Sequence, residues 1–431
     1  MIYFRNLRKI RKRYDLTQEE LANKLGVSEA YISSLEDSTE ETVQATSEFI
    51  AKLRDVFDLH GIPLTDNDMT LFYDELSNLR FSIDYGYMDR AKEAIPDLVR
   101  RADASCLPSF INLCELHVAH YYQSIDNTKA YDKLMASLKE KMATFDHRQH
   151  YYYHRLVGTQ AYKARKYDKA LSAYIKAEKL DKQSKISEVS FYYMYGMILS
   201  GMGYATRAVE YYEKAVHHAR WNKVFYGKPN NRYNVQIDSY LAYNLSKIKK
   251  GEKALEILNK RLRFEKRKES PDDIIGFIYY SLGRVYFNIG DYTEAEDNHE
   301  MASIYLSKSN EAYIHNLYHK AKALIALDKT TEAIARLDEG LNNPLDDMWE
   351  YLFESVKHSI NLSNSRSIQY LTETLIPKLL EHRCLEETLN YCRMISEFYA
   401  KDNNHKLALE YSNQALALAE KLLAFRVRRG L

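Results

Sequence analysis

The chain has 431 residues, of which 45% are hydrophobic and 28% are charged, and its formal net charge is +1. This near-neutral balance excludes a partner that is held by net charge alone, so any contact with DNA has to come from a local basic patch. The chain has only seven prolines and fourteen glycines, which predicts an all-α fold. It lacks a signal-peptide core and any run of about 18 apolar residues, so we expect a cytoplasmic protein without membrane contact.

The first predicted helix spans residues 3–14, with Phe4, Leu7 and Ile10 at helical spacing on one side. Residues 1–13 carry six basic side chains and no acidic one, a composition that suits a phosphate backbone. We therefore predict that Arg8, within this basic stretch, binds DNA.

Residues 17–36, TQEELANKLGVSEAYISSLE, predict two short helices that are joined by a tight turn. Thr17 caps the first helix in a capping box with Glu20, and Gly26 ends that helix. Ser28 caps the second helix, whose outward side chains are the ones that a major groove would meet. The segment therefore predicts a DNA-reading device.

The same segment resembles the phage-repressor type (XRE class) of helix-turn-helix domain, in which a glutamine opens the first helix of the motif and a polar recognition helix follows the glycine. The resemblance implies contacts with the DNA backbone for Gln18, Ser28 and Tyr31, and contacts with the bases for Glu29, Ala30 and Ser34. It also implies a structural ion pair between Arg11, in the opening helix, and Glu36, at the end of the recognition helix.

The loop after the recognition helix departs from this family. Asp37, Glu40 and Glu41 stand where the family usually has a glycine and a basic or neutral loop. We expect these carboxylates to weaken DNA binding, because they bring negative charge close to the phosphates. A helix-turn-helix that serves only as a packing motif, without touching DNA, therefore stays open as an alternative.

A further helix is predicted over residues 43–59, and it completes a small helical bundle. Gly, Pro and short polar residues then break the periodicity. We place the DNA-binding domain at residues 1–62, a linker at 63–69, and a repeat domain at 70–431.

The repeat domain is predicted from small residues that recur at a fixed spacing. A glycine is followed twelve residues later by an alanine at positions 158 and 170, 196 and 208, and 283 and 295. Small residues let the backbones of two antiparallel helices approach where they cross. Together with the turn NIGDYTEA at 288–295, this spacing resembles the tetratricopeptide repeat, a helix pair that stacks into a superhelix.

A phage-repressor type head joined to long tetratricopeptide repeats resembles the RRNPP family of peptide pheromone receptors of Gram-positive bacteria and their phages. In that family the repeats dimerise and bind a short signalling peptide in their concave groove, and binding changes how the two DNA-reading heads are held. The resemblance implies a quorum-sensing transcriptional regulator, whose partners are an operator in double-stranded DNA, a short signalling peptide and a second copy of the chain.

Candidate peptide-binding residues lie on the first helices of the repeats, which line the inner surface of such a superhelix. Asparagine offers both a donor and an acceptor to a peptide backbone, and arginine is suited to a carboxylate. We predict peptide contacts for Asn244, Asn288, Asn316, Tyr193, Tyr280, Tyr318 and Arg284. Ordinary repeat packing is the competing interpretation for each of them.

Two other classes of function remain open. One is a repeat scaffold that sequesters a response regulator, and the other is a phosphatase of such a regulator, for which we identify no catalytic residue. The chain has no phosphate-binding loop and no dinucleotide-binding motif. We therefore expect no cofactor, no metal and no enzyme activity.

Overall fold

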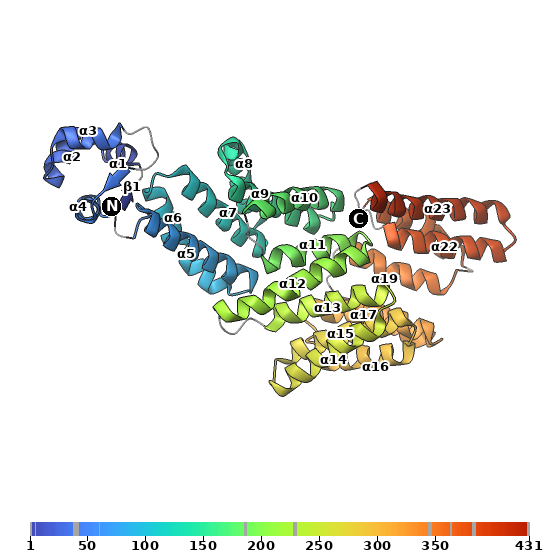
Figure 1. The fold of residues 1–431 in the computed structure, drawn as a ribbon. Coiled ribbons are helices and arrows are strands. Elements are labelled where there is room, and N and C mark those ends of the chain that lie inside the picture. Colours follow the sequence, from blue (N-terminus) through green and yellow to red (C-terminus); the bar gives the residue numbers. More distant parts are fainter. Residues whose placement is uncertain are drawn as a thin grey trace. The chain divides into compact units, whose positions relative to one another are not determined.

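The computed structural model describes residues 2–4, 6–37, 43–59, 61–184, 188–226, 231–343, 347–362, 364–381 and 385–428. These residues form α-helices joined by short turns, with one two-stranded sheet (Figure 1), so the all-α prediction is confirmed. The chain divides into two compact units. The first unit comprises Met1–Gln160 with Ala173–Ile186, and the second comprises Ala161–Ser172 with Ser187–Leu431.

The head at the start of the first unit contains β1 (Ile2–Phe4), α1 (Leu7–Arg13), α2 (Gln18–Leu25), α3 (Glu29–Glu36), β2 (Val43–Ala45) and α4 (Ser47–Phe57). The predicted caps are present: Thr17 and Glu20 form a capping box, and the Ser28 side chain accepts from the Tyr31 N–H. Gly26 ends α2 with a φ of 68°, a value that favours glycine.

Two predicted helix starts in the head are wrong. The opening helix begins at Leu7 instead of residue 3, because Asn6 has a φ of 66° and the residues before it pair with a distant strand. That strand is β2, where Ala45 lies opposite Ile2 in antiparallel register, so the next helix begins only after it, with Thr46 as its cap. A strand pairing over forty residues leaves little trace in local periodicity.

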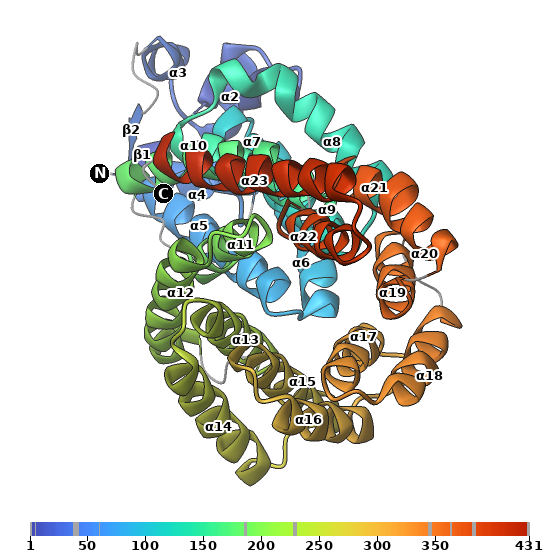
Figure 2. The same cartoon turned by 90° about the vertical axis from the view of Figure 1, so that its right-hand side faces the viewer.

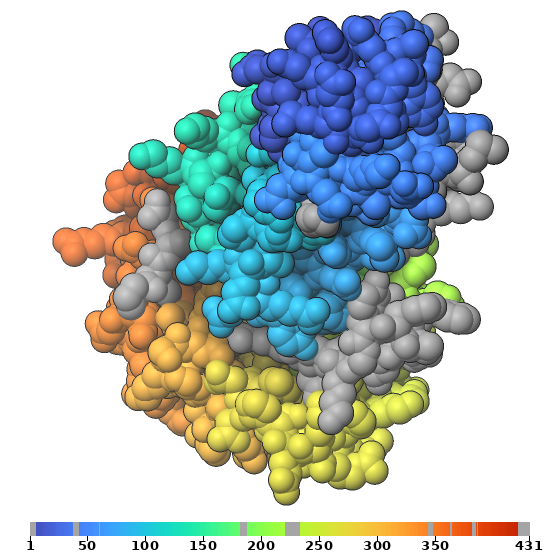
Figure 3. All heavy atoms as spheres, turned by 90° about the vertical axis from the view of Figure 1, so that its left-hand side faces the viewer, coloured from blue at the N-terminus to red at the C-terminus, as the bar shows by residue number. Residues whose placement is uncertain are grey.

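The rest of the first unit is formed by α5 (Asp66–Asp84), α6 (Met88–Ala104), α7 (Pro108–Ser124), α8 (Thr128–Lys141), η1 (Met142–Thr144), most of α9 (His147–Lys163) and the second part of α10 (Tyr167–Ser184). Figure 3 shows the atoms of the head directly beside those of the helices that follow it. An ion pair between Arg54 of α4 and Asp68 of α5 joins the head to these helices. Arg101 of α6 also donates a hydrogen bond to the Gly61 carbonyl. The head is therefore held by the first helices of the array.

The second unit contains α11 (Val189–Gly201), α12 (Ala205–Tyr226), α13 (Asn231–Lys247), α14 (Gly251–Arg267), α15 (Asp272–Ile289), α16 (Tyr292–Tyr305), α17 (Glu311–Ala326), α18 (Thr330–Leu341), α19 (Asp347–Ile360), α20 (Ser365–Gln369), η2 (Tyr370–Leu375), α21 (Ile376–Glu381), α22 (Leu385–Lys401) and α23 (His405–Arg428). Figure 2 shows the pairs from α11 and α12 to α17 and α18 following one another along a curve. This arrangement confirms the predicted superhelix of helix pairs.

Close approaches between helices explain the small residues of the repeats. A Cβ atom on Gly283 would lie 2.6 Å from the ring of His299, and one on Gly340 would lie 2.0 Å from the ring of Phe353. Neither distance is possible without a shift of the neighbouring side chain. Glycine at these positions therefore lets a ring of the following helix lie against the backbone.

Candidate functional site

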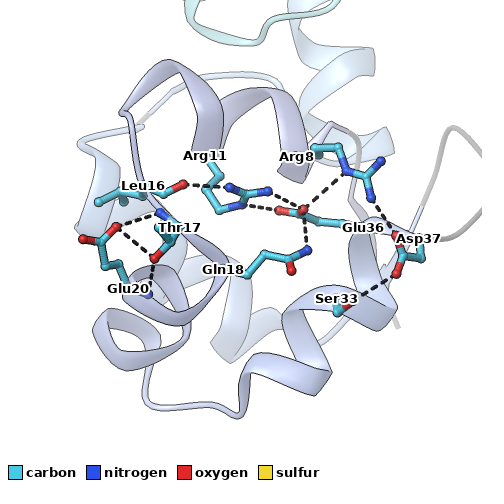
Figure 4. A network of polar contacts seen from close by, with 9 residues as sticks. All are labelled: Arg8, Arg11, Leu16, Thr17, Gln18, Glu20, Ser33, Glu36 and Asp37. Carbon is cyan, nitrogen blue, oxygen red and sulfur yellow. Dashed lines mark hydrogen bonds and ion pairs between the residues drawn. The ribbon is translucent and has the colours of Figure 1, made fainter.

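The helix-turn-helix is held together by a buried ion pair between α1 and α3. The Arg11 Nε and Nη2 atoms donate to the two Glu36 carboxylate oxygens, at 2.7 Å each, and Nη1 donates to the Leu16 carbonyl at 2.7 Å. The carboxylate of Glu36 is fully buried, so both of its oxygens need such partners. This two-point contact fixes the end of the recognition helix against the opening helix (Figure 4).

Two predicted DNA-binding side chains contact carboxylates in the same network. Gln18 Nε2 donates to Glu36 Oε2 at 2.9 Å. Arg8 donates to Glu36 Oε2 at 3.4 Å and to Asp37 Oδ1 at 2.6 Å. Figure 4 shows both side chains pointing toward these acids. The basic patch at the start of the chain is therefore partly neutralised beside α3.

Burial and hydrogen bonding act in opposite directions on Glu36. Burial favours the neutral carboxyl group, but the hydrogen bonds from Arg11 and Gln18 outweigh it, and the pKa of Glu36 lies below its ordinary value. The Glu36 carboxylate in turn raises the pKa of Arg11. Both groups are therefore charged at neutral pH, and the network is ionic.

The exposed face of α3 consists of short side chains. Glu29, Ala30 and Ser34, which the resemblance assigns to the bases, are all exposed. The Ser34 hydroxyl donates to the Tyr31 carbonyl at 2.8 Å, and the half-buried Tyr31 ring packs edge-on against Phe49 at 5.6 Å. The predicted base-facing residues thus share an open surface, whereas Tyr31 is also part of the core of the head.

Of the acidic loop that was expected to weaken DNA binding, the described residues include Asp37 alone. It accepts a hydrogen bond from Ser33 as well as from Arg8. Glu40 and Glu41 lie outside the described residues.

The second unit contains a cavity of about 200 Å³, which lies between the C-terminal halves of α11, α13 and α15 and the first turns of α19 and α22. It is lined by Tyr162, Arg165, Tyr167, Met197, Ser200, Gly201, Tyr240, Tyr243, Lys247, Arg284, Met348, Leu352 and Glu387. Arg284 lies between two aromatic rings of this region. Its guanidinium carbon is 3.7 Å from the centre of the Tyr243 ring and 5.4 Å from that of the Tyr280 ring. Burial raises the pKa of Tyr280 to about 12, so this tyrosine is neutral.

A larger cavity, of about 780 Å³, lies at the N-terminal ends of α13, α15 and α17. Its lining includes Gln236, Asp273, Glu311 and His315, with Phe277 on one side. Tyr240 lines both cavities. The two cavities therefore adjoin at Tyr240, and together we call them the inner groove.

The seven predicted peptide-binding residues lie in different places. Arg284 lines the inner groove, and Tyr280 contacts Arg284. Tyr193 is 8% exposed and packs against Tyr212 and Tyr240. Tyr318, also 8% exposed, packs against Trp349 and Phe353. Tyr193 therefore supports Tyr240 in the wall of the groove, whereas Tyr318 is part of a hydrophobic core cluster with Phe353.

The three predicted asparagines make packing or helix-to-helix contacts in the structure. Asn316 is fully buried, donates to the His299 carbonyl at 2.8 Å and accepts from His299 Nδ1 at 2.7 Å. Asn244 is 1% exposed and donates to the carbonyl one turn before it, at Tyr240. The exposed Asn288 donates to Ser246 at 2.9 Å. None of them lines either cavity of the inner groove.

Sequence reasoning missed four residues beside Arg284, namely Tyr240, Tyr243, Lys247 and Lys322. Tyr240, Tyr243 and Lys247 line the inner groove. Lys322 is close enough for its charge to act on Tyr243 and Arg284. A signal was available in the sequence for three of these positions: Tyr243, Arg284 and Lys322 each come directly after the small crossing residue of their repeat, Ala242, Gly283 and Ala321.

Two family models match the chain. Residues 7–59 match the helix-turn-helix model, and residues 189–216 and 278–300 match the tetratricopeptide repeat. The transcriptional activator NprA of Geobacillus stearothermophilus is 20% identical to the chain over 328 residues, which are 70% of this chain and 76% of NprA. The crystal structure of NprR in complex with its cognate peptide NprX shares the fold, with a TM-score of 0.65 at 15% identity over 81% of this chain and 99% of that one.

The chain therefore combines a helix-turn-helix head with tetratricopeptide repeats, and it is similar to a transcriptional activator in sequence and to a peptide-bound quorum sensor in fold. A second relative is the response regulator aspartate phosphatase J of Bacillus subtilis (strain 168). It is 28% identical over 194 residues, which are 43% of this chain and 46% of the phosphatase. Within the described residues, no helix combines the length and the apolar character that crossing a membrane requires.

Proposed function

We propose that the chain is a cytoplasmic transcription regulator that reads an operator through α3 and is switched by a short signalling peptide in the inner groove. The combination that supports this function is a repressor-type head with an open recognition face, in one chain with a tyrosine- and cation-lined groove. The names of two relatives agree with it, since NprA is a transcriptional activator and NprR was crystallised with a peptide.

Glu29, Ala30 and Ser34 face the bases, and Gln18, Ser28 and Tyr31 face the phosphates, as the resemblance implies. Arg8, in the basic opening stretch, faces the phosphates as well. Glu36 orients Gln18: an amide nitrogen carries two N–H groups, and the Glu36 carboxylate occupies one of them. The other N–H remains to be donated to a phosphate oxygen.

We also propose that the protein acts as a homodimer, and that the last helix provides a contact between the two copies. Leu409 and Leu416 of α23 are 62% and 59% exposed, and they lie seven residues apart, on one face of the helix. The terminal helix of a repeat array normally has a polar outer face, because nothing stacks on it. Two heads joined in this way would meet two half-sites of an operator.

The peptide acts on the spacing of the two heads. A superhelix of helix pairs changes its curvature when its inner surface is filled, and the heads are attached to its first helices. A ligand shifts such an equilibrium only by its difference in affinity for the two shapes. Peptide binding and operator binding should therefore be coupled, and each should change the affinity of the other by the same factor.

The test begins with selection of the operator from random duplexes by the full-length protein. Gel-shift titration of the selected duplex follows, with and without a pool of short peptides. Ser34→Ala should lower operator affinity about tenfold or more, as expected for the loss of a base contact, while Lys260→Ala on the outer helix α14 should leave it unchanged. Equal affinity with and without every peptide would remove the switch.

Sequestration or dephosphorylation of a response regulator is the second candidate function, and the similarity to aspartate phosphatase J supports it. The carboxylates of Glu36 and Asp37 also favour it, because they lie beside Gln18 and Arg8 and would weaken binding of the head to DNA. The double variant Gln18→Ala, Ser34→Ala separates the two candidates. Regulation through DNA should be lost in this variant, whereas capture of a response regulator should be unaffected.

A further inference from the structure

The helix α3 has a restricted set of hydrogen-bonding groups for reading a duplex. Its sequence, EAYISSLE, contains no arginine, lysine, asparagine or glutamine. These four side chains are the usual donors of hydrogen bonds to guanine and adenine in the major groove. The polar groups that α3 offers to the bases are therefore carboxylates and hydroxyls.

The two serine hydroxyls of α3 already use their hydrogens within the protein. Ser34 Oγ donates to the Tyr31 carbonyl at 2.8 Å. Ser33 Oγ donates to Asp37 Oδ2 at 3.0 Å, and Figure 4 shows these two side chains pointing toward each other. Each hydroxyl oxygen keeps lone pairs, which accept hydrogen bonds. Together with the carboxylate of Glu29, the base-facing polar groups of α3 are thus hydrogen-bond acceptors.

Glu29 is the acceptor with the best position for contact with a base. It is the first residue of α3 and is exposed. The N-terminal residues of a recognition helix are the ones that contact base edges in the major groove. The Glu29 carboxylate forms no hydrogen bond or ion pair with the part of the chain that the structure describes. Its oxygens are therefore available to a donor on the DNA.

A carboxylate distinguishes between the two bases that present an amino group in the major groove. The N4 amino group of cytosine has the guanine O6 acceptor on one side and the apolar C5 edge of cytosine on the other. The N6 amino group of adenine lies between two acceptors, adenine N7 and thymine O4. A carboxylate is repelled by acceptors, so it meets less repulsion at cytosine than at adenine.

We propose that α3 selects a cytosine through Glu29 and the methyl group of a neighbouring thymine through Ala30. The Glu29 carboxylate accepts from the N4 amino group of the cytosine. Ala30 is exposed next to it and presents only a methyl group, which packs on the C5-methyl group of the thymine. This proposal rests on the proposed reading of an operator by α3, and it adds the identity of the bases that are read.

The acidic character of this surface has a consequence for selectivity. Glu29 and Asp37 bring negative charge close to the phosphates of a duplex of any sequence, and this charge weakens binding. A cytosine amino group opposite Glu29 offsets the repulsion, because it gives the carboxylate a hydrogen-bond donor. Binding to a duplex without that cytosine should therefore be weak.

The first part of the test uses the unaltered full-length protein and the duplex that it selects from random sequences. Each cytosine is replaced in turn by N4-methylcytosine, which keeps base pairing and blocks the N4–H group that faces the major groove. We expect one cytosine in each half-site at which this replacement lowers the affinity about tenfold. Replacement of the neighbouring thymine by deoxyuridine, which lacks the methyl group, should lower the affinity about threefold.

The second part assigns the cytosine to Glu29. In Glu29→Gln the new amide can both accept and donate, and this pattern fits the N6 and N7 atoms of adenine. Selection repeated with this variant should yield adenine where the unaltered protein selects cytosine. Glu48→Gln on α4 is the matched control, because it removes the same charge from an exposed side chain of the head that pairs with Lys52 at 3.1 Å. It should select the cytosine.

The outcomes separate this proposal from the proposed function. A selected duplex whose affinity is unchanged by N4-methylation of every cytosine would overturn the proposed base contact and leave operator reading intact. The same conclusion would follow if Glu29→Gln selected the sequence of the unaltered protein. If Glu29→Gln selects no duplex, the base replacements with the unaltered protein decide alone. Enrichment of no duplex by the unaltered protein would overturn both the base contact and the reading of an operator.

Discussion

Gln18 Nε2 donates to Glu36 Oε2 at 2.9 Å, and the same oxygen accepts a hydrogen bond from Arg11 Nη2 at 2.7 Å. One buried carboxylate thus joins the opening helix, the first helix of the motif and the recognition helix. The side chain proposed to hold a phosphate is therefore positioned by the ion pair that stabilises the head. A substitution at Glu36 should therefore lower both the stability of the head and its affinity for DNA.

Arg11→Ala should destabilise the head by about 3 kcal/mol, because it leaves the Glu36 carboxylate buried without its main partner. The measurement is amide hydrogen exchange of α1 and α3 in the full-length protein, which reads the local opening free energy. Lys12→Ala, an exposed neighbour, is the control and should change exchange little. Unchanged exchange in Arg11→Ala would show that the pair adds nothing to the head.

The head should also lose stability in acid. The folded-state pKa of Glu36 is below the ordinary value of 4.5, so the stabilisation is complete above that pH and is lost as the pH falls through the lower, folded-state pKa. Exchange of the α3 amides, corrected for the intrinsic rate at each pH, should reveal this loss. In Glu36→Gln the head should be less stable at neutral pH and its acid dependence should be smaller; an identical acid dependence would contradict the assignment.

Asp37→Asn should strengthen binding to duplex DNA, because it frees Arg8 from a contact of 2.6 Å and removes a negative charge beside the phosphates. We expect a several-fold higher affinity at low salt and a steeper dependence on salt concentration, both measured by fluorescence anisotropy with a random duplex. Asp89→Asn on α6 makes the same change in net charge away from the head. The prediction fails if the two variants behave alike.

Gly340→Ala should destabilise the second unit by about 1–3 kcal/mol, because the new Cβ would lie 2.0 Å from the Phe353 ring, between α18 and α19. Gly201→Ala is a suitable comparison, since its Cβ would lie 3.0 Å from the Tyr167 ring, which needs a much smaller shift. Urea unfolding of the two variants should give a clear difference in the midpoint. Equal midpoints would mean that the α18 to α19 crossing relaxes freely.

Leu409→Glu combined with Leu416→Glu should make the protein monomeric if α23 joins the two copies. Analytical ultracentrifugation over a range of concentrations measures the change. The control is Lys406→Glu, which places a negative charge on the exposed start of the same helix without removing an apolar side chain. A dimer that survives the double substitution would place the interface elsewhere.

The helix-turn-helix could be predicted in detail because its signals are local. The cap at Thr17, the turn at Gly26 and the cap at Ser28 are decided by neighbouring residues, and the structure shows each of them where the sequence predicts it. The start of the opening helix was wrong for the opposite reason. Residues 2–4 pair with Val43–Ala45, and this partner is distant in the chain.

The prediction of the inner groove was weaker for the same physical reason. Asparagine is chemically suited to a peptide backbone, yet Asn316 uses its amide on His299 in the neighbouring helix, a contact that no spacing in the sequence announces. Whether a side chain on a first helix faces the groove or the next pair depends on a small rotation of that helix. Only the solvent exposure of that side chain in the folded structure distinguishes the two cases.

By itself, the sequence determined that the protein is helical, that its head is of the repressor type and that its array consists of stacked pairs, because caps, turns and small crossing residues act over a few positions. Only the tertiary structure decided which charges share a surface. Arg165, Lys247 and Arg284 are far apart in the sequence, and the stacking of the repeats brings them into the lining of one cavity. Electrostatic interaction depends on distance in space, and in a repeat protein that distance is set by how the helices pack.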